Sequence, residues 1–394
     1  MPVRLLLLTL AMQTLATMAV FSLPTAAPEI ARELRFDAAR IGFFVSAVYG
    51  IGIGSAVLSP NFIHRFGAIR VGQFVTLVVV LMLALAGSGS LVALALSAVV
   101  LGIGYGATAP VGTHLLVPNT RPTRLNLVLS LRQIGVPLGG VLAALLVPPL
   151  TLALDWHWAL WLQIVPAVLL LAAMQADRAR FDAERDPGKR VISGELLRPL
   201  YLLRANGEVR ILSVACFFYA GIQICFIAFL VVQLTAIVGL DLIAAGQALA
   251  AYQVAGVLGR PLWGWIADHW IPARRLLALH GLVMAAAAVA AGQFAPGWPL
   301  PLIWLVCVTA GATASGFTGI AYGEFARAGG AERTEATAVG SAAMFAGVTV
   351  LPSLFSTSIG LDAGYGWTYA AAAALALAGA VPLLGGRRSG RGKF

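Results

Sequence analysis

Two arginines lie inside long apolar segments of the sequence, where a charge is expensive. Arg132 lies within residues 125–150 and Arg260 within residues 243–266, and both segments are long enough to cross a membrane. An ionisable residue inside such a span costs at least about 2.5–3.5 kcal/mol, so it indicates a functional role by default. A planar guanidinium can bind a carboxylate through two parallel hydrogen bonds. These two residues therefore predict recognition of an anion.

The apolar segments contain no Asp or Glu at mid-depth. The acidic residues nearest to them lie at segment ends: Glu29, Asp155, Asp241 and Asp362 on one side, and Asp268, Glu324 and Glu335 on the other. Two buried guanidiniums without carboxylate partners are costly in an empty site, and a substrate carboxylate would supply the missing charge. The alternative is a structural role, in which both side chains extend to the headgroup region over about 10 Å.

The composition places the whole chain in a membrane. Of its 394 residues, 60% are apolar and only 11% are charged, and the mean hydropathy is +0.89. A soluble domain has about a quarter charged residues and under half apolar ones. The net charge of +10 comes without the aromatic-interleaved basic patches of nucleic-acid-binding proteins, so we predict no nucleic-acid partner. Three cysteines in apolar segments (Cys216, Cys225 and Cys307) indicate no disulfide framework.

Twelve segments pass a filter of about 20 mostly apolar residues. They are residues 5–27, 41–60, 69–88, 91–114, 125–150, 156–176, 208–237, 243–266, 275–292, 298–322, 335–358 and 366–385. The first is too long for the apolar region of a cleaved signal peptide. The sequence therefore predicts an all-α membrane protein with 12 transmembrane helices.

The basic residues between the spans define the orientation. With both termini on the cytoplasmic side, 21 Lys and Arg residues fall in cytoplasmic loops, tails and linker, three (Arg32, Arg35 and Arg40) fall outside, and two lie in spans, which together make the total of 26. Cytoplasmic loops of membrane proteins carry such an excess. We predict a multi-pass protein of the inner (cytoplasmic) membrane with both termini in the cytoplasm.

The sequence contains a duplication. Asp37, Gly52 and His64 align with Asp241, Gly256 and Asp268 at an offset of 204, and residues 155–159 align with residues 366–370 at an offset of 211. A parallel repeat of this kind is typical of transporters. We predict an N-terminal six-helix bundle over residues 1–176 and a C-terminal six-helix bundle with a short basic tail over residues 208–394. Between them lies a charged cytoplasmic linker, residues 177–207, with an amphipathic helix expected at 193–204.

Twelve spans, a 6+6 duplication and a long charged central loop resemble the major facilitator superfamily, which implies two pseudo-symmetric six-helix bundles. The family signature after the second helix of each half is Gly, three residues, Asp-Arg, one residue and Gly, with basic residues following. Residues 264–269 (GWIADH) with Arg274 and Arg275 are similar to it. The first copy, residues 60–67 (PNFIHRFG), departs from it, because His64 replaces the aspartate and Pro60 the glycine. The resemblance implies gating roles for Asp268, His64, Arg65 and Gly264, and the departure puts the carboxylate-based latch of the first half in question.

Residues 130–140 (SLRQIGVPLGG) resemble bacterial cyanate- and nitroimidazole-type members and, more loosely, organic-acid carriers. The family fold implies that helices five and eight are neighbours across the interface between the halves. Arg132 and Arg260 lie at similar depths, roughly 10 Å and 9 Å from the cytoplasmic ends of their helices. We therefore expect them to converge on one anion.

Other polar residues complete the predicted substrate site. Helices one, four, seven and ten line the central cavity in the family, and Tyr219 and Gln223 lie one turn apart on helix seven. The predicted substrate contacts are Arg260, Arg132, Tyr219, Gln223, Tyr49, Gln133, Tyr252 and Tyr105. For each polar residue the alternative is a hydrogen bond within the helix bundle.

Three residues are candidates for proton coupling. They are His114 near the end of the fourth span and the boundary carboxylates Glu29 and Glu324. Anion–proton symport, uniport and anion exchange are all consistent with these residues, as are import and export.

The residues favour a secondary transporter that moves a small carboxylate-type anion by alternating access, with protons as a candidate coupling partner. A proton-coupled multidrug transporter, which would be expected to hold an intramembrane carboxylate, and a neutral-solute transporter are the alternatives. No P-loop, metal-spaced His and Cys set or nucleophile elbow is present, so we predict no enzymatic activity, no catalytic residue, no metal site and no cofactor. We expect a monomer in the lipid bilayer.

Overall fold

A computed structural model describes residues 3–35, 41–189, 191, 197–240, 242–360 and 364–385. The described chain is almost entirely helical, because a backbone in hydrocarbon must satisfy its own N–H and C=O groups. Within the described residues, ten segments are long and apolar enough to cross a membrane, and one of these, Leu300–Ile359, covers two of the predicted spans. The helix of the remaining predicted span, Leu242–His269, is not among the ten.

The N-terminal half comprises α1 to α10. Their bounds are α1 Val3–Thr25, α2 Ala27–Leu34, α3 Ile41–Phe66, α4 Ala68–Ala86, α5 Leu91–Tyr105, α6 Thr108–Leu116, α7 Leu125–Gln133, α8 Gly135–Ala153, α9 Trp156–Trp161 and α10 Ile164–Phe181. Three spans are built from two helices each, α5 with α6, α7 with α8 and α9 with α10. The predicted span 125–150 is thus interrupted at Ile134.

The short helix α11 (Arg198–Ala205) precedes the C-terminal half, and it overlaps the amphipathic helix expected at 193–204, of which residues 193–196 lie outside the described residues. The C-terminal half comprises α12 Gly207–Gln233, η3 Leu234–Val238, α13 Leu242–His269, α14 Ala273–Gly292, α15 Leu300–Ala310, η4 Gly311–Ser315, α16 Thr318–Gly329, α17 Arg333–Gly360 and α18 Gly364–Leu384. A π-helical turn, η4, joins α15 to α16 within one span. Such turns are frequent at functional sites.

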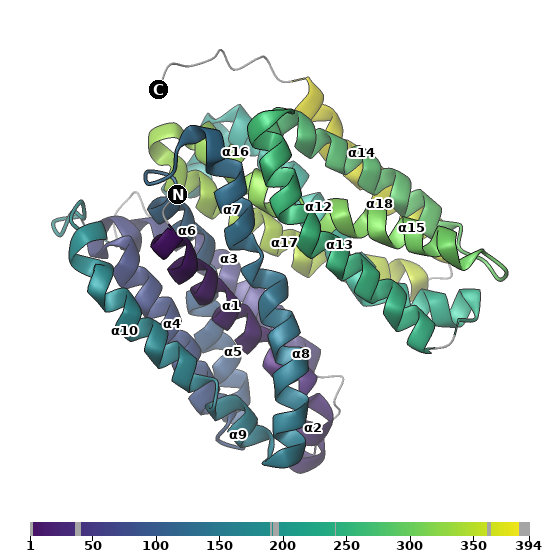
Figure 1. Cartoon of the computed structure of the whole chain (residues 1–394), viewed down its shortest axis with the longest axis horizontal. Helices are drawn as coiled ribbons and strands as arrows, with labels where there is room; N and C mark the ends of the chain where they lie inside the picture. The colour runs from purple at the N-terminus through teal and green to yellow at the C-terminus, as the bar shows by residue number, and fades with distance from the viewer. Residues whose placement is uncertain are drawn as a thin grey trace.

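The two halves meet at one end of the molecule and diverge toward the other (Figure 1). Contacts between the halves join α3 to α17, α6 to α17, and α7 to both α13 and α16. We call the end at which they meet the basic end; it includes Arg4, Arg65, Arg124, Arg274 and Arg327. α3 and α13 extend beyond the predicted spans 41–60 and 243–266, so His64 and Asp268 lie in the last turns of helices at this end.

Candidate functional site

Arg132 is buried at the end of α7, with only 1% of its surface exposed. Its guanidinium donates to three neutral oxygens: Nη1 to Gln133 Oε1 at 2.8 Å, and Nη2 to Gln13 Oε1 at 2.9 Å and to the Thr108 carbonyl at 2.6 Å. Its Nε is buried and has no hydrogen-bond partner in the described part of the chain. Among its described residues, the N-terminal half thus holds this cation without a counter-charge.

Arg260 on α13 crosses to the N-terminal half. Its Nη1 donates to the backbone carbonyl of Gln133. In a continuous helix that carbonyl would accept from the backbone N–H of residue 137, but Pro137 has no N–H. The proline in the fifth span therefore frees the oxygen that Arg260 uses.

The rest of the Arg260 guanidinium is held by the turn η4. Nε donates to the Ser315 carbonyl at 2.9 Å, and Nη2 donates to Ser315 Oγ at 3.4 Å. Arg260 is also only 1% exposed. Among the described residues, no carboxylate lies within ion-pair distance of Arg132 or Arg260.

Gln133 joins the two arginines. Its side-chain Oε1 accepts from Arg132 and its backbone oxygen accepts from Arg260, so one residue of the N-terminal half contacts both guanidiniums. The structure therefore brings Arg132, Arg260 and Gln133 together across the interface between the halves.

Aromatic side chains lie beside this group. Tyr105, Tyr49 and Phe345 form three ring contacts with centroid separations of 5.3–5.6 Å, and Phe345 belongs to α17 of the other half. The Tyr105 hydroxyl shares a hydrogen bond of 3.3 Å with Thr17, which accepts from the side chain of Gln13. Tyr105 is thus linked to Arg132 through two polar side chains.

A latch at the basic end fixes the start of α7 against the C-terminal half. Asp268 Oδ2 accepts from the backbone N–H of Leu127 at 2.9 Å, and Oδ1 accepts from the backbone and side-chain N–H groups of Asn126 at 3.1 and 2.7 Å. Asn126 Oδ1 accepts in turn from Arg327 of α16 at 2.8 Å. A carboxylate at the N-terminus of a helix is favoured by the free N–H groups and the helix dipole.

A second contact closes the basic end from the first half. His64 Nε2 lies 2.8 Å from Glu335 Oε1 in the first turn of α17, and His114 Nδ1 lies 2.8 Å from Thr334 Oγ1 beside it. Glu335 Oε2 is buried without a hydrogen-bond partner among the described residues. The missing aspartate at position 64 is thus replaced by a histidine that meets a carboxylate of the opposite half.

The other two predicted gating residues have different roles. Arg65 Nη1 donates to the Lys189 carbonyl in the linker region at 2.9 Å. Gly264 gives α7 room, because a Cβ at this position would lie 2.7 Å from Ser130 Oγ and 2.8 Å from the Asn126 carbonyl. Gly264 therefore belongs to the contact between the halves, whereas Arg65 attaches α3 to the linker.

Comparison with known proteins explains this architecture. The family model described as Major Facilitator Superfamily matches residues 9–326 and 211–393, which together are nearly the whole chain. The chain belongs to the Major Facilitator Superfamily. It is therefore a multi-pass secondary transporter of 12 helices in two six-helix bundles, as the sequence predicts.

Solved structures with this fold include the proton:xylose symporter XylE bound to 6-bromo-6-deoxy-D-glucose. Its sequence identity to this chain is 14% and its TM-score is 0.74, and the match covers 97% of this chain and 94% of that chain. The human organic anion transporter MFSD10 (TETRAN) has 16% identity, 96% and 99% coverage, and a TM-score of 0.73. A variant of the E. coli fucose:proton symporter FucP has 13% identity, 96% and 98% coverage, and a TM-score of 0.71. No curated protein sequence matches the chain.

Within this superfamily fold, Tyr219 has no hydrogen bond to either buried arginine among the described residues. Its hydroxyl donates to the Leu277 carbonyl at 3.2 Å, and a Cβ at Gly281 would lie 2.0 Å from that hydroxyl. Because this α12 side chain is buried against α14, we remove Tyr219 from the proposed substrate contacts. The sequence spacing predicts that Tyr219 lies in a helix, but it does not predict the rotation of α12 that places Tyr219 against α14.

Gln223 and Tyr252 lie nearer to Arg260. Gln223 Nε2 donates to Ser315 Oγ at 3.3 Å, the same hydroxyl that Arg260 contacts, and the Tyr252 hydroxyl donates to the Gln223 carbonyl at 3.3 Å. The two predicted residues are therefore connected to Arg260 through Ser315.

The structure does not bring the three proton-coupling candidates together. Glu29 pairs with Arg32 on α2, at the end where the halves diverge. Glu324 pairs with Arg327 at the basic end, and His114 bonds to Thr334 there. None of the three has a hydrogen bond or ion pair to either buried arginine in the part of the chain that the structure describes.

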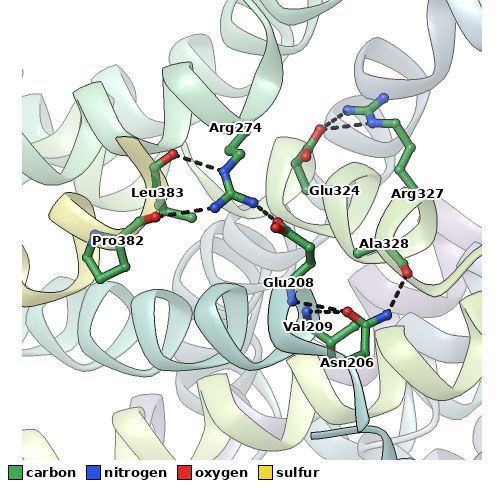
Figure 2. Close-up of polar contacts among 9 residues, drawn as sticks. All are labelled: Asn206, Glu208, Val209, Arg274, Glu324, Arg327, Ala328, Pro382 and Leu383. Atoms are coloured by element: carbon green, nitrogen blue, oxygen red, sulfur yellow. Dashed lines mark hydrogen bonds and ion pairs between the residues drawn. The ribbon is translucent and has the colours of Figure 1, made fainter. Parts of the chain in front are cut away.

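The basic end of the C-terminal half carries its own polar network (Figure 2). Arg274 pairs with Glu208 at the start of α12 and donates to the carbonyls of Leu383 and Pro382 on α18. Asn206 caps α12 and donates to the Ala328 carbonyl at the end of α16. These bonds hold four helix ends together and leave Arg274 a structural role.

Several residues that complete the site are not among the predicted substrate contacts or gating residues. Gln13 and Ser315 bind the two arginines, and Asn126 and Glu335 complete the two latches. Glu335 could have been found from the repeat, because His64 aligns with Asp268 and must therefore face the start of α17 as Asp268 faces the start of α7. Gln13 and Ser315 lie on two of the helices expected to line the central cavity, but nothing in their local sequence separates them from the other polar residues of those helices.

Proposed function

We propose that this transporter moves a small organic anion, and that Arg132 and Arg260 bind its carboxylate. The observation that carries the proposal is the pair of buried guanidiniums that share Gln133 and have no carboxylate partner among the described residues. Neutral oxygens satisfy their donors only in part, because Arg132 Nε has none. An anionic ligand would add the charge that such a site lacks.

The position of Gln133 between the halves supports alternating access. A carboxylate that binds both arginines competes with the Gln133 oxygens for the same N–H donors. Binding would then change the contact between α7 and α13, and a ligand shifts a conformational equilibrium only through such a difference in contacts. We propose that the basic end is cytoplasmic, since most Lys and Arg residues lie there, and that the described conformation is closed on that side of the inner membrane.

Protons are the proposed coupling partner, and the contact of α3 and α6 with α17 supplies the groups that could exchange them. His64, His114 and Glu335 meet at the contact between α3, α6 and α17. A substrate acid that crosses with its own proton is the second route.

A thermal-shift panel on the purified protein tests the substrate class. Acetate, lactate and benzoate serve as acids, xylose as a neutral solute and tetraphenylphosphonium as a cation. A ligand at 100 times its Kd stabilises the protein by about 2.7 kcal/mol. We expect at least one acid to raise the melting temperature. Stabilisation by xylose alone or by the cation alone would contradict the anion assignment and favour the neutral-solute or multidrug alternative.

A further inference from the structure

The N-terminal half contains a cavity of about 750 Å³ between α3 and α4. Its remaining walls come from α5, α10 and the α5–α6 junction, so every lining residue belongs to this half. The two buried arginines do not line it. The cavity is therefore separate from the pathway between the halves, and the substrate site does not account for it.

The walls of the cavity are apolar. Phe62, Phe66, Phe74 and Leu77 line it, and between 40% and 48% of each of these side chains is exposed. The hydroxyl of Ser59, which also lines it, donates to the carbonyl of Ala56. In a bilayer such a volume is filled by hydrocarbon, because it offers water few polar partners.

Among the described residues that line the cavity, one is charged, and it lies nearest the basic end. Arg70 lies in the first turn of α4, and its Nη1 donates to Gln73 Oε1 at 3.0 Å. The side-chain amide of Gln73 donates to the Leu171 carbonyl and to Gln175 Oε1. Arg70 Nε and Nη2 have no hydrogen-bond partner among the described residues, so this guanidinium can still donate to a ligand.

Asp182 lies beside the same turn, but its carboxylate is already used. Its two oxygens accept from the backbone N–H groups of Ile69 and Arg70 at 2.8 and 3.0 Å. Burial raises the pKa of this carboxyl, although both N–H groups act in the opposite direction. Asp182 therefore caps α4 and forms no ion pair with the Arg70 guanidinium.

We propose that this cavity binds one anionic phospholipid, with an acyl chain between α3 and α4 and the phosphate on Arg70. Basic pockets between transmembrane helices on the cytoplasmic side are suited to anionic headgroups. The apolar walls favour an acyl chain. Both kinds of headgroup offer a phosphate to the guanidinium, but the cation of a zwitterionic headgroup offsets that attraction, so a net anionic headgroup is favoured.

A lipid at this place would support the gate. α3 is one wall of the cavity, and the same helix carries Tyr49 and His64, which contact Phe345 and Glu335 of the other half. Filling the cavity holds α3 against the rest of its bundle. The closed basic end then depends on the lipid composition of that leaflet.

The test uses the full-length protein purified in detergent and titrated with phosphatidylglycerol or phosphatidylcholine that carry identical oleoyl chains. We expect phosphatidylglycerol to raise the melting temperature more than phosphatidylcholine, with one tightly bound lipid in native mass spectra. Arg70→Gln should reduce the effect of phosphatidylglycerol to that of phosphatidylcholine. Gly54→Leu should abolish the bound lipid, since Gly54 lines the cavity and has open space at its Cβ position.

Two matched variants separate this site from general effects. Arg121→Gln removes an exposed charge elsewhere at the basic end, and Gly50→Leu adds the same side chain one turn from Gly54, where there is also open space but no cavity wall. Both should keep the lipid preference. Equal stabilisation by the two lipids, an unchanged preference in Arg70→Gln, or the same shift from water-soluble glycerol 3-phosphate would each overturn the proposal.

Discussion

At the scale of single residues, Gln133 contacts both buried cations. It offers one oxygen from its side chain and one from its backbone, and the second is available only because Pro137 lacks an N–H. An amide oxygen carries a partial charge, so it satisfies a guanidinium donor less well than a carboxylate does. A carboxylate would therefore be a stronger acceptor than Gln133 for the same N–H donors.

Gln133→Glu should act as a built-in substrate. The new carboxylate would lie at hydrogen-bond distance from Arg132 and complete a buried ion pair. We expect a higher melting temperature for the empty protein and no further stabilisation by the acid that stabilises the wild type.

The matched control is Gln233→Glu. Gln233 is also buried, but its amide donates to the Ala291 carbonyl and it has no arginine partner among the described residues. This variant should melt at a lower temperature than the wild type, because its new charge is unpaired. A Gln133→Glu protein that still responds to the acid would exclude Gln133 from the substrate site.

At the scale of helices, close packing of α7 on α13 and α16 closes the basic end. A Cβ at Gly319 on α16 would lie 2.2 Å from Ser130 Oγ, and one at Gly323 would lie 2.3 Å from Asn126 Oδ1. Together with Gly264 on α13, these glycines let α7 approach two helices of the other half closely. Small residues at helix contacts are the usual means of close approach in membranes.

Gly264→Leu should therefore open the basic end. The larger side chain meets the Asn126 backbone, which cannot move without breaking the Asp268 cap on α7. Spin labels at positions 123 and 331 in a cysteine-free background should report a longer distance than in the wild type.

Gly246→Leu on the same helix, where a Cβ has open space, provides the control and should leave the distance unchanged. An unchanged distance in Gly264→Leu as well would show that this contact does not determine the closed state.

At the scale of the whole molecule, some features can be predicted from each segment alone, whereas others depend on how the helices pack. Spans, fold class and the two isolated arginines follow from hydropathy and the cost of buried charge, which act on each segment alone. The contacts of Tyr219 and Ser315 depend on how helices rotate about their axes, and no local pattern encodes that rotation. The contact of Glu335 is partly predictable. The alignment of His64 with Asp268 indicates that His64 faces the start of α17, where Glu335 lies.

Uptake by the reconstituted transporter tests the central claim most directly. The acid that stabilises the wild type most would be supplied in labelled form to proteoliposomes containing the wild type, Arg132→Gln, Arg260→Gln or the exposed control Arg121→Gln. Loss of one partner of a buried charge pair costs about 2–5 kcal/mol, so we predict at least about a tenfold loss of uptake in both buried-site variants and none in the control. Uptake at the wild-type rate by either Arg132→Gln or Arg260→Gln, with the protein folded, would contradict the claim that this pair binds the transported anion.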